Sequence, residues 1–152
     1  MRDPRLAQLA DVLLTHSLKL KEGEKLMIAG EHSTKPLIKE LLEKAYEMGV
    51  IPYFELGDLE LNRIMVTNAK AEQMILRNKW DLQKYQDLDA FLSISSDAND
   101  AEMSEVPAEQ WQLLMPYMKE SNDYLIQNKR WALLNYPNHA LAQKAKMSYD
   151  TF

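Results

Sequence analysis

The stretch KLMIAGEHSTKPLIKELLEKAYEMGVIPYFEL, residues 25–56, decides the fold. It opens with a short apolar run that ends at Gly30, as is typical of a buried parallel strand. A helix with an apolar stripe follows and ends at Gly49. Residues 50–56 then read as a second strand. A strand, a helix and another strand in this order predict a βαβ unit and a parallel sheet.

The alternation of helix and strand continues on both sides of this unit. A helix is expected to start at Asp3 and Pro4, and Pro116 is expected to kink or divide a later helix because it removes a donor. The remaining expected elements are helices within residues 59–87, a strand at 89–95, a helical region at 107–129, a strand at 130–136 and a last helix through Ala140, Leu141 and Ala145. We therefore predict a single α/β domain over residues 1–152. Its doubly wound, mainly parallel sheet is expected to have about four strands, in the order 2-1-3-4, with helices on both faces.

Composition and charge exclude several classes of protein. The 46% hydrophobic and 27% charged residues are those of a globular chain. A net charge of −5 gives no electrostatic reason to expect binding to nucleic acid or to an anionic membrane. The absence of cysteine excludes thiolate catalysis and cysteine-ligated metals. No stretch approaches the roughly 20 apolar residues of a membrane span, and no signal peptide is evident, so a cytoplasmic protein is expected.

No complete catalytic or cofactor motif is present. The loop at residues 30–34 contains one glycine and Glu31, whereas a phosphate cradle needs several glycines and no acid, so Gly30 reads as a strand end before a helix cap at Ser33 or Thr34. The three histidines are far apart in the sequence, and His16 is expected on or beside the buried stripe of the first helix. We therefore assign no catalytic, cofactor-binding or metal-binding residue to this chain.

Four segments, taken in order, resemble the amino-terminal region of the thermophilic metallo-aminopeptidases of the aminopeptidase T and aminopeptidase S type, often labelled leucyl aminopeptidase. These segments are DPRLAQLADVLLTHSLKLKEGEKLMIAG (3–30), KPLIKELLEKAYEMGVIPYFEL (35–56), DAFLSISSDAND (89–100) and RWALLNYPNHALAQKAKMS (130–148). The chain departs from the family pattern at Asn138 and His139, where the family usually has Thr-Pro.

The resemblance implies a non-catalytic, amino-terminal domain of an enzyme that removes amino-terminal residues from peptides. The parent enzyme would use two divalent metal ions of the zinc, cobalt or magnesium class, and their ligands would belong to a carboxy-terminal catalytic domain that this chain lacks. That domain and the peptide substrate are the implied partners, together with a homo-oligomer. Residues 147–152 resemble the first turn of another helix, and the docking surface is expected around this segment, Tyr136 and Leu141.

The functional face is expected at the carboxyl ends of the strands, where strand order reverses. The loops there, residues 30–34 and 95–101, contain the candidate cavity-facing residues Glu31, His32, Asp97 and Asp100. Their acids would favour the amino group of a peptide, but ordinary solvated loops are an alternative. Two other functions also stay open. One is a free-standing flavodoxin-like module that binds a small ligand or nucleotide, and the other is a structural or oligomerisation domain.

Overall fold

The computed structural model describes residues 3–95 and 103–136. In chain order the elements are α1 (Pro4–Val12), the π-helix η1 (Leu13–Ser17), β1 (Lys25–Glu31), the 3-10 helix η2 (His32–Thr34), α2 (Lys35–Glu47), β2 (Ile51–Gly57), α3 (Leu59–Asn68), α4 (Ala71–Asp87), β3 (Ala90–Ser95), α6 (Ala108–Asn128) and β4 (Arg130–Asn135). The last predicted helix lies outside the described residues. No helix in the two described ranges is long and apolar enough to cross a bilayer.

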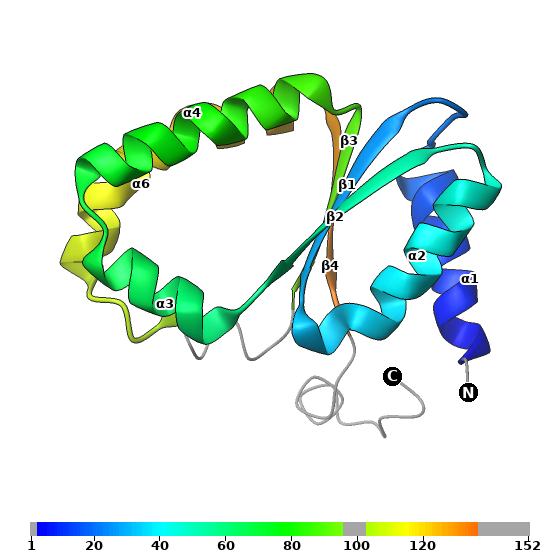
Figure 1. Ribbon diagram of the computed structural model, residues 1–152, viewed down its shortest axis with the longest axis horizontal. Helices are drawn as coiled ribbons and strands as arrows, with labels where there is room; N and C mark the ends of the chain where they lie inside the picture. The colour runs from blue at the N-terminus through cyan, green and yellow to red at the C-terminus, as the bar shows by residue number, and fades with distance from the viewer. Residues whose placement is uncertain (1–2, 96–102, 137–152) are drawn as a thin grey trace.

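The four strands form one parallel sheet in the order β2-β1-β3-β4. This confirms the predicted fold class and the strand order 2-1-3-4. Because the chain moves from β1 to one neighbour and then crosses back to the other, its connecting helices lie on opposite sides of the sheet. Figure 1 shows α1 and α2 on one side and α3, α4 and α6 on the other.

The main hydrophobic core lies between the sheet and the two helices α1 and α2. Its fully buried members come from all three layers and include Leu14, Leu26, Ile28, Leu37, Leu41 and Leu92. Complete burial of one such side chain contributes roughly 1.5–3 kcal/mol, so this cluster is the main source of stability. Asp3 begins α1 by accepting a hydrogen bond from the Arg5 amide at 2.9 Å, as the sequence indicates.

Arg130 joins the fourth strand to the first helical layer. Its Nη1 donates to the backbone oxygens of Leu18 at 3.0 Å and Lys19 at 2.8 Å, just after η1. Its Nη2 pairs with the Glu24 carboxylate, immediately before β1. A guanidinium is suited to this task because it offers several donors in a fixed plane. Arg130 therefore fixes the start of β4 against segments more than a hundred residues earlier in the chain.

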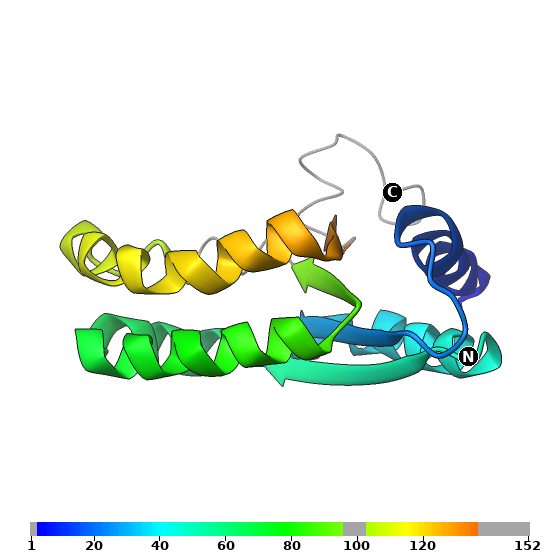
Figure 2. The same ribbon diagram turned by 90° about the horizontal axis from the view of Figure 1, so that it is seen from above.

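A second, smaller core lies within the layer of α3, α4 and α6. Figure 2 shows α4 and α6 running side by side. The buried members of this core are Val66, Ala69, Met74, Val106 and Leu114. Two polar contacts support them: Gln110 Nε2 donates to the backbone oxygens of Val66 and Ala69, both at 2.8 Å, and Asn78 Oδ1 accepts from the Ser121 amide at 3.0 Å. The layer of α3, α4 and α6 is thus stabilised mainly by contacts among these three helices and the loops between them.

Of the two effects expected of Pro116, a kink or a division of the helix, the division does not occur, because α6 runs unbroken from Ala108 to Asn128. A proline inside a helix costs about 3 kcal/mol. Here Pro116 is exposed, while Leu114, Ser121 and Leu125 are buried. Packing of this buried face against α4 offsets the cost of the proline.

The sheet face that looks toward α4 is only partly covered. Cross-strand register aligns Tyr53, Met27, Phe91 and Trp131 in one row across all four strands. Tyr85, near the end of α4, packs on Phe91 with ring centroids 5.5 Å apart, whereas Tyr53 and Trp131 are each 47% exposed. Parallel sheets are usually covered on both faces, so this surface is unusual.

The predicted docking surface is wrong at Tyr136. That residue is buried in the main core, and its amide donates to the Ser95 backbone oxygen at 2.7 Å. Leu141 and residues 147–152 lie outside the described residues. Exposed apolar side chains on the same strand are Trp131 and Leu133, on β4.

Candidate functional site

A hollow of about 480 Å³ lies at the carboxyl ends of β1, β2 and β3. Its floor comes from the last residues of the three strands and one wall from the first turns of α3. The residues that line it are Ala29, Gly30, Glu31, Leu56, Gly57, Asp58, Leu59, Leu61, Asn62, Met65, Ser93, Ile94 and Ser95. This is the place where open parallel sheets bind ligands, because strand order reverses between β1 and β3. We call it the strand-end hollow.

The turn after β1 is shaped by Gly30 and Thr34. Thr34 is fully buried, and its hydroxyl donates to the Glu31 backbone oxygen at 2.7 Å. A Cβ at position 30 would lie 2.4 Å from the Thr34 hydroxyl oxygen, so glycine is needed for this close approach. Thr34 occupies the N-cap position of α2 but makes no side-chain cap hydrogen bond. The loop therefore contains a tightly packed turn, and its single glycine is explained without a phosphate.

The lining of the strand-end hollow is acidic. Glu31 comes from the end of β1, and Asp58 follows the end of β2. Asp58 Oδ1 accepts a hydrogen bond from the Leu61 amide at 2.9 Å and so begins α3. Among the described residues that line it, none is a lysine, an arginine or a histidine. Two acids in the lining favour a cationic group over a phosphate or a carboxylate.

The structure places the predicted site residues unequally. Glu31 lines the strand-end hollow, whereas His32 is exposed in η2 and does not line it. Asp97 and Asp100 lie outside the described residues. His16 is exposed, so its expected place on or beside the buried stripe is wrong: the turn from Leu13 to Ser17 is a π-helix, whose wider turn shifts the side chains that follow.

The described residues do not fit a divalent metal. Over residues 3–95 and 103–136, no three side chains of His, Asp or Glu gather closely enough to hold a metal ion. A metal centre needs several such ligands held together. This part of the chain therefore provides no set of ligands for a metal ion.

The sequence analysis missed Asp58 and Asn62 as lining residues. Their signal was present, because Gly57 and Asp58 follow the second strand just as Gly30 and Glu31 follow the first. In a parallel sheet all strand ends meet at one edge, so the end of the second strand also belongs to the expected site.

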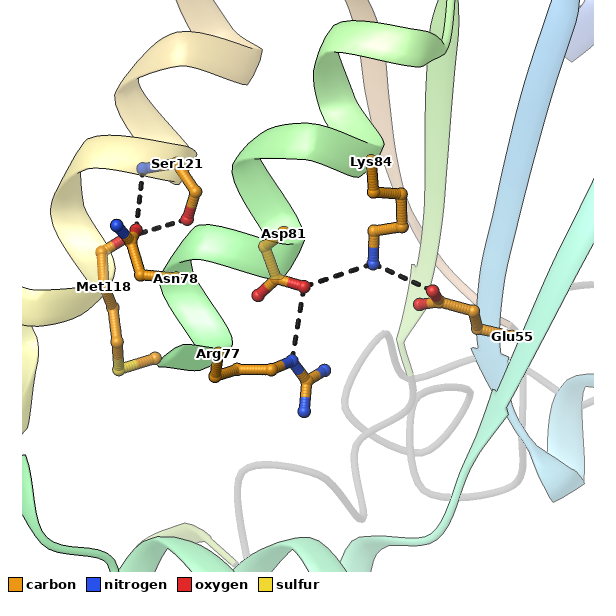
Figure 3. Close-up of polar contacts among 7 residues, drawn as sticks. All are labelled: Glu55, Arg77, Asn78, Asp81, Lys84, Met118 and Ser121. Atoms are coloured by element: carbon orange, nitrogen blue, oxygen red, sulfur yellow. Dashed lines mark hydrogen bonds and ion pairs between the residues drawn. The ribbon is translucent and has the colours of Figure 1, made fainter. Parts of the chain in front are cut away.

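A row of ion pairs lies on the partly covered sheet face and joins β2 to α4 (Figure 3). Lys84 Nζ lies 2.8 Å from Glu55 Oε1 and 3.4 Å from Asp81 Oδ1, and Arg77 Nε donates to the same Asp81 oxygen at 3.2 Å. We call these four residues the charge row. Burial raises the pKa of the neighbouring Tyr85 to about 12, and the negative charges of Asp81 and Glu55 add to the rise.

Comparison with known proteins gives one family match. Residues 2–152 match the model of a family described as thermophilic metalloprotease (M29). No curated protein matches the chain.

Among solved structures, the chain is similar to wild-type AmpT from Thermus thermophilus, with a TM-score of 0.69 and 17% sequence identity. The match covers 89% of this chain and 36% of that chain, so the present chain spans little more than a third of the AmpT length. At this identity the likeness shows the fold alone.

Two further structures match more weakly. One is a putative LacI-family transcription repressor from Corynebacterium glutamicum, with a TM-score of 0.37, 10% identity and coverage of 86% of this chain and 59% of that chain. The other is the CurK enoyl reductase, with a TM-score of 0.39, 14% identity and coverage of 93% and 44%. Neither supports an argument about function.

Proposed function

The chain belongs to the thermophilic metalloprotease family, and from that premise we propose that it is the non-catalytic, substrate-binding domain of a metal-dependent aminopeptidase. The family match and the AmpT fold confirm the resemblance seen in the sequence. Metal-dependent peptidase chemistry follows at the level of the family. The assignment of this chain to substrate binding, and of the enzyme to removal of amino-terminal residues, is our proposal.

The observation that carries the proposal is the acidic strand-end hollow. Glu31 and Asp58 line it, and Ser93, Ser95 and Asn62 add hydrogen-bonding groups. A peptide presents a positively charged amino group followed by amide donors and acceptors, which matches this lining. A nucleotide module fits less well, because Glu31 and Asp58 would repel phosphate.

The metal ions are proposed to lie in another part of the enzyme, the carboxy-terminal catalytic domain. Two observations support this division: the described residues contain no group of metal ligands, and the chain spans 36% of AmpT. When bound, a pair of zinc, cobalt or magnesium ions would polarise the scissile carbonyl and supply a hydroxide. The present chain would then contribute binding and orientation of the peptide.

The test is metal binding and hydrolysis by this chain on its own. We expect no stoichiometric site of sub-micromolar affinity for zinc, cobalt or magnesium in calorimetry, and no release of the chromogenic group from an aminoacyl substrate. A longer polypeptide of the same family that includes the carboxy-terminal region serves as the positive control. Metal-dependent hydrolysis by the present chain, with metal bound at a fixed ratio, would overturn the proposal.

A further inference from the structure

A second hollow, of about 140 Å³, lies among α3, α4 and α6, away from the strand ends. Asn62 and Met65 line both this hollow and the strand-end hollow, so the two are adjacent. The second hollow also has Met118 and Trp111 from α6 and Arg77 from α4 in its walls. We call it the helix hollow.

Arg77 is the charged group of the helix hollow that is suited to receive an anion. Its Nε donates to Asp81 at 3.2 Å, and its two Nη nitrogens make no hydrogen bond to the described part of the chain. Figure 3 shows its guanidinium extending away from α4, on the side where β2 and α3 lie. The side chain is thus held through its Nε by Asp81, which lines the same hollow, and it is about half exposed. A guanidinium in this arrangement can bind a carboxylate through two parallel hydrogen bonds.

The surrounding charges favour this orientation of a ligand. The charge row alternates in sign from Glu55 through Lys84 and Asp81 to Arg77, which is its terminal member. An incoming carboxylate would continue the alternation. The two bases, Lys84 and Arg77, are matched by the two acids, Glu55 and Asp81, so the row itself carries no net charge. The strand-end hollow next to it is acidic. The strand-end hollow therefore has acids and no base among its described lining residues, whereas the helix hollow holds the guanidinium of Arg77 paired with the carboxylate of Asp81.

The walls between these charges suit a peptide. Asn62 offers amide groups that can pair with a peptide backbone, and Met65 and Met118 offer flexible, polarisable side chains that adapt to different residues. Such a lining gives contact with many peptides without selecting one side chain.

We propose that Arg77 binds the free carboxylate end of a short peptide whose amino end lies in the strand-end hollow. This inference rests on the proposed function and extends it. The domain would then recognise both ends of its ligand and select short peptides with a free carboxyl terminus over longer chains.

The experiment compares tri-alanine with its carboxy-terminal amide, using calorimetry with the chain. We expect the amide to bind roughly tenfold more weakly, since it removes one charged, bidentate contact. Arg77→Gln should weaken binding of the free acid to the level of the amide and leave binding of the amide unchanged. Arg77→Lys should not restore the loss, because an ammonium does not form the two parallel bonds. Arg63→Gln makes the same charge change outside both hollows and should leave the two affinities unchanged.

The outcomes separate this inference from the proposed function. Equal affinity of wild-type chain for the acid and the amide would overturn the role of Arg77 and leave peptide binding intact. So would an effect of Arg77→Gln no larger than that of Arg63→Gln. Inorganic phosphate binding at Arg77 as tightly as the tripeptide would also overturn it. Failure of both tripeptide forms to bind at millimolar concentration would count against the proposed function itself. The acid and amide comparison needs no substitution, so it remains decisive even if Arg77→Gln folds poorly.

Discussion

Gly30 shows how a single residue shapes the site. Its missing side chain leaves room for the buried Thr34 hydroxyl, which closes the turn at the edge of the strand-end hollow. A methyl group at position 30 would also lie 3.1 Å from Ile38 Cδ1, in the main core. Both neighbours are buried, so neither can move freely.

Gly30→Ala is therefore expected to lower the free energy of unfolding by about 1–3 kcal/mol, the usual cost of overpacking. Urea denaturation followed by circular dichroism measures the change. Gly57→Ala is the matched control, because a Cβ there meets only the Gly30 backbone oxygen at an ordinary 3.7 Å. A Gly30→Ala variant as stable as Gly57→Ala would show that the turn is not tightly packed.

At the scale of the element, α4 meets the sheet through its last turns. Lys84 pairs with Glu55, and Tyr85 is buried against Phe91. Because the pKa of Tyr85 is raised to about 12, the folded chain keeps this proton at pH values where the unfolded chain, with an ordinary pKa near 10, has lost it.

The stability contributed by Tyr85 is thus complete below about pH 10 and is lost as the pH rises toward 12. Two pKa units correspond to at most about 2–3 kcal/mol. Urea midpoints measured from pH 8 to 11.5 should fall more steeply for the wild-type chain than for Tyr85→Phe, which has no phenolic proton at this position. Parallel curves for the two proteins would contradict the burial of the Tyr85 hydroxyl.

The elements themselves were largely predictable from the sequence. Each strand is a short apolar run between turn residues, and the observed strands begin and end within a residue or so of the predicted ones. The predictions failed where the local structure depends on features that the spacing of apolar residues does not show. The continuity of α6 across Pro116 depends on packing against α4, and the exposure of His16 depends on a π-helical turn that periodicity does not reveal.

The candidate site was predictable only in part. The predicted strand order places the end of β1 at the edge of the sheet where ligands bind, so Glu31 could be predicted as a residue of the strand-end hollow. The helix hollow could not be predicted, because Arg77, Asn62 and Met118 come to line one hollow only after three helices pack together. The charge row beside it depends on the ion pair between Lys84 on α4 and Glu55 on β2, and these two elements are separated in the sequence by the whole of α3.

At the scale of the whole molecule, the partly covered sheet face is the main exposed apolar surface near the core. Trp131 is 47% exposed and Leu133 63% exposed, both on the edge strand β4. Such a surface promotes association with another protein surface. In the proposed enzyme the catalytic domain or a second copy of the chain would cover it.

Taken alone, the chain is therefore expected to associate with itself as its concentration rises. Sedimentation velocity should show a growing average mass for the wild-type chain and a smaller rise for Leu133→Glu, which places a charge on this face. Leu113→Glu introduces the same charge at a 49% exposed position on α6 and should behave as wild type. A monomer at every concentration, or an equal effect of both substitutions, would rule out association through the β4 surface.

The central claim, that this chain is a peptide-binding domain, is tested most directly by amide chemical shifts during titration with unlabelled tri-alanine. We predict saturable shifts for Glu31, residues 58–62 and residues 93–95, around the strand-end hollow. The shifts should be present without added metal, because peptide binding is assigned to this chain alone. Unchanged spectra at millimolar peptide, or shifts confined to residues outside both hollows, would contradict the account.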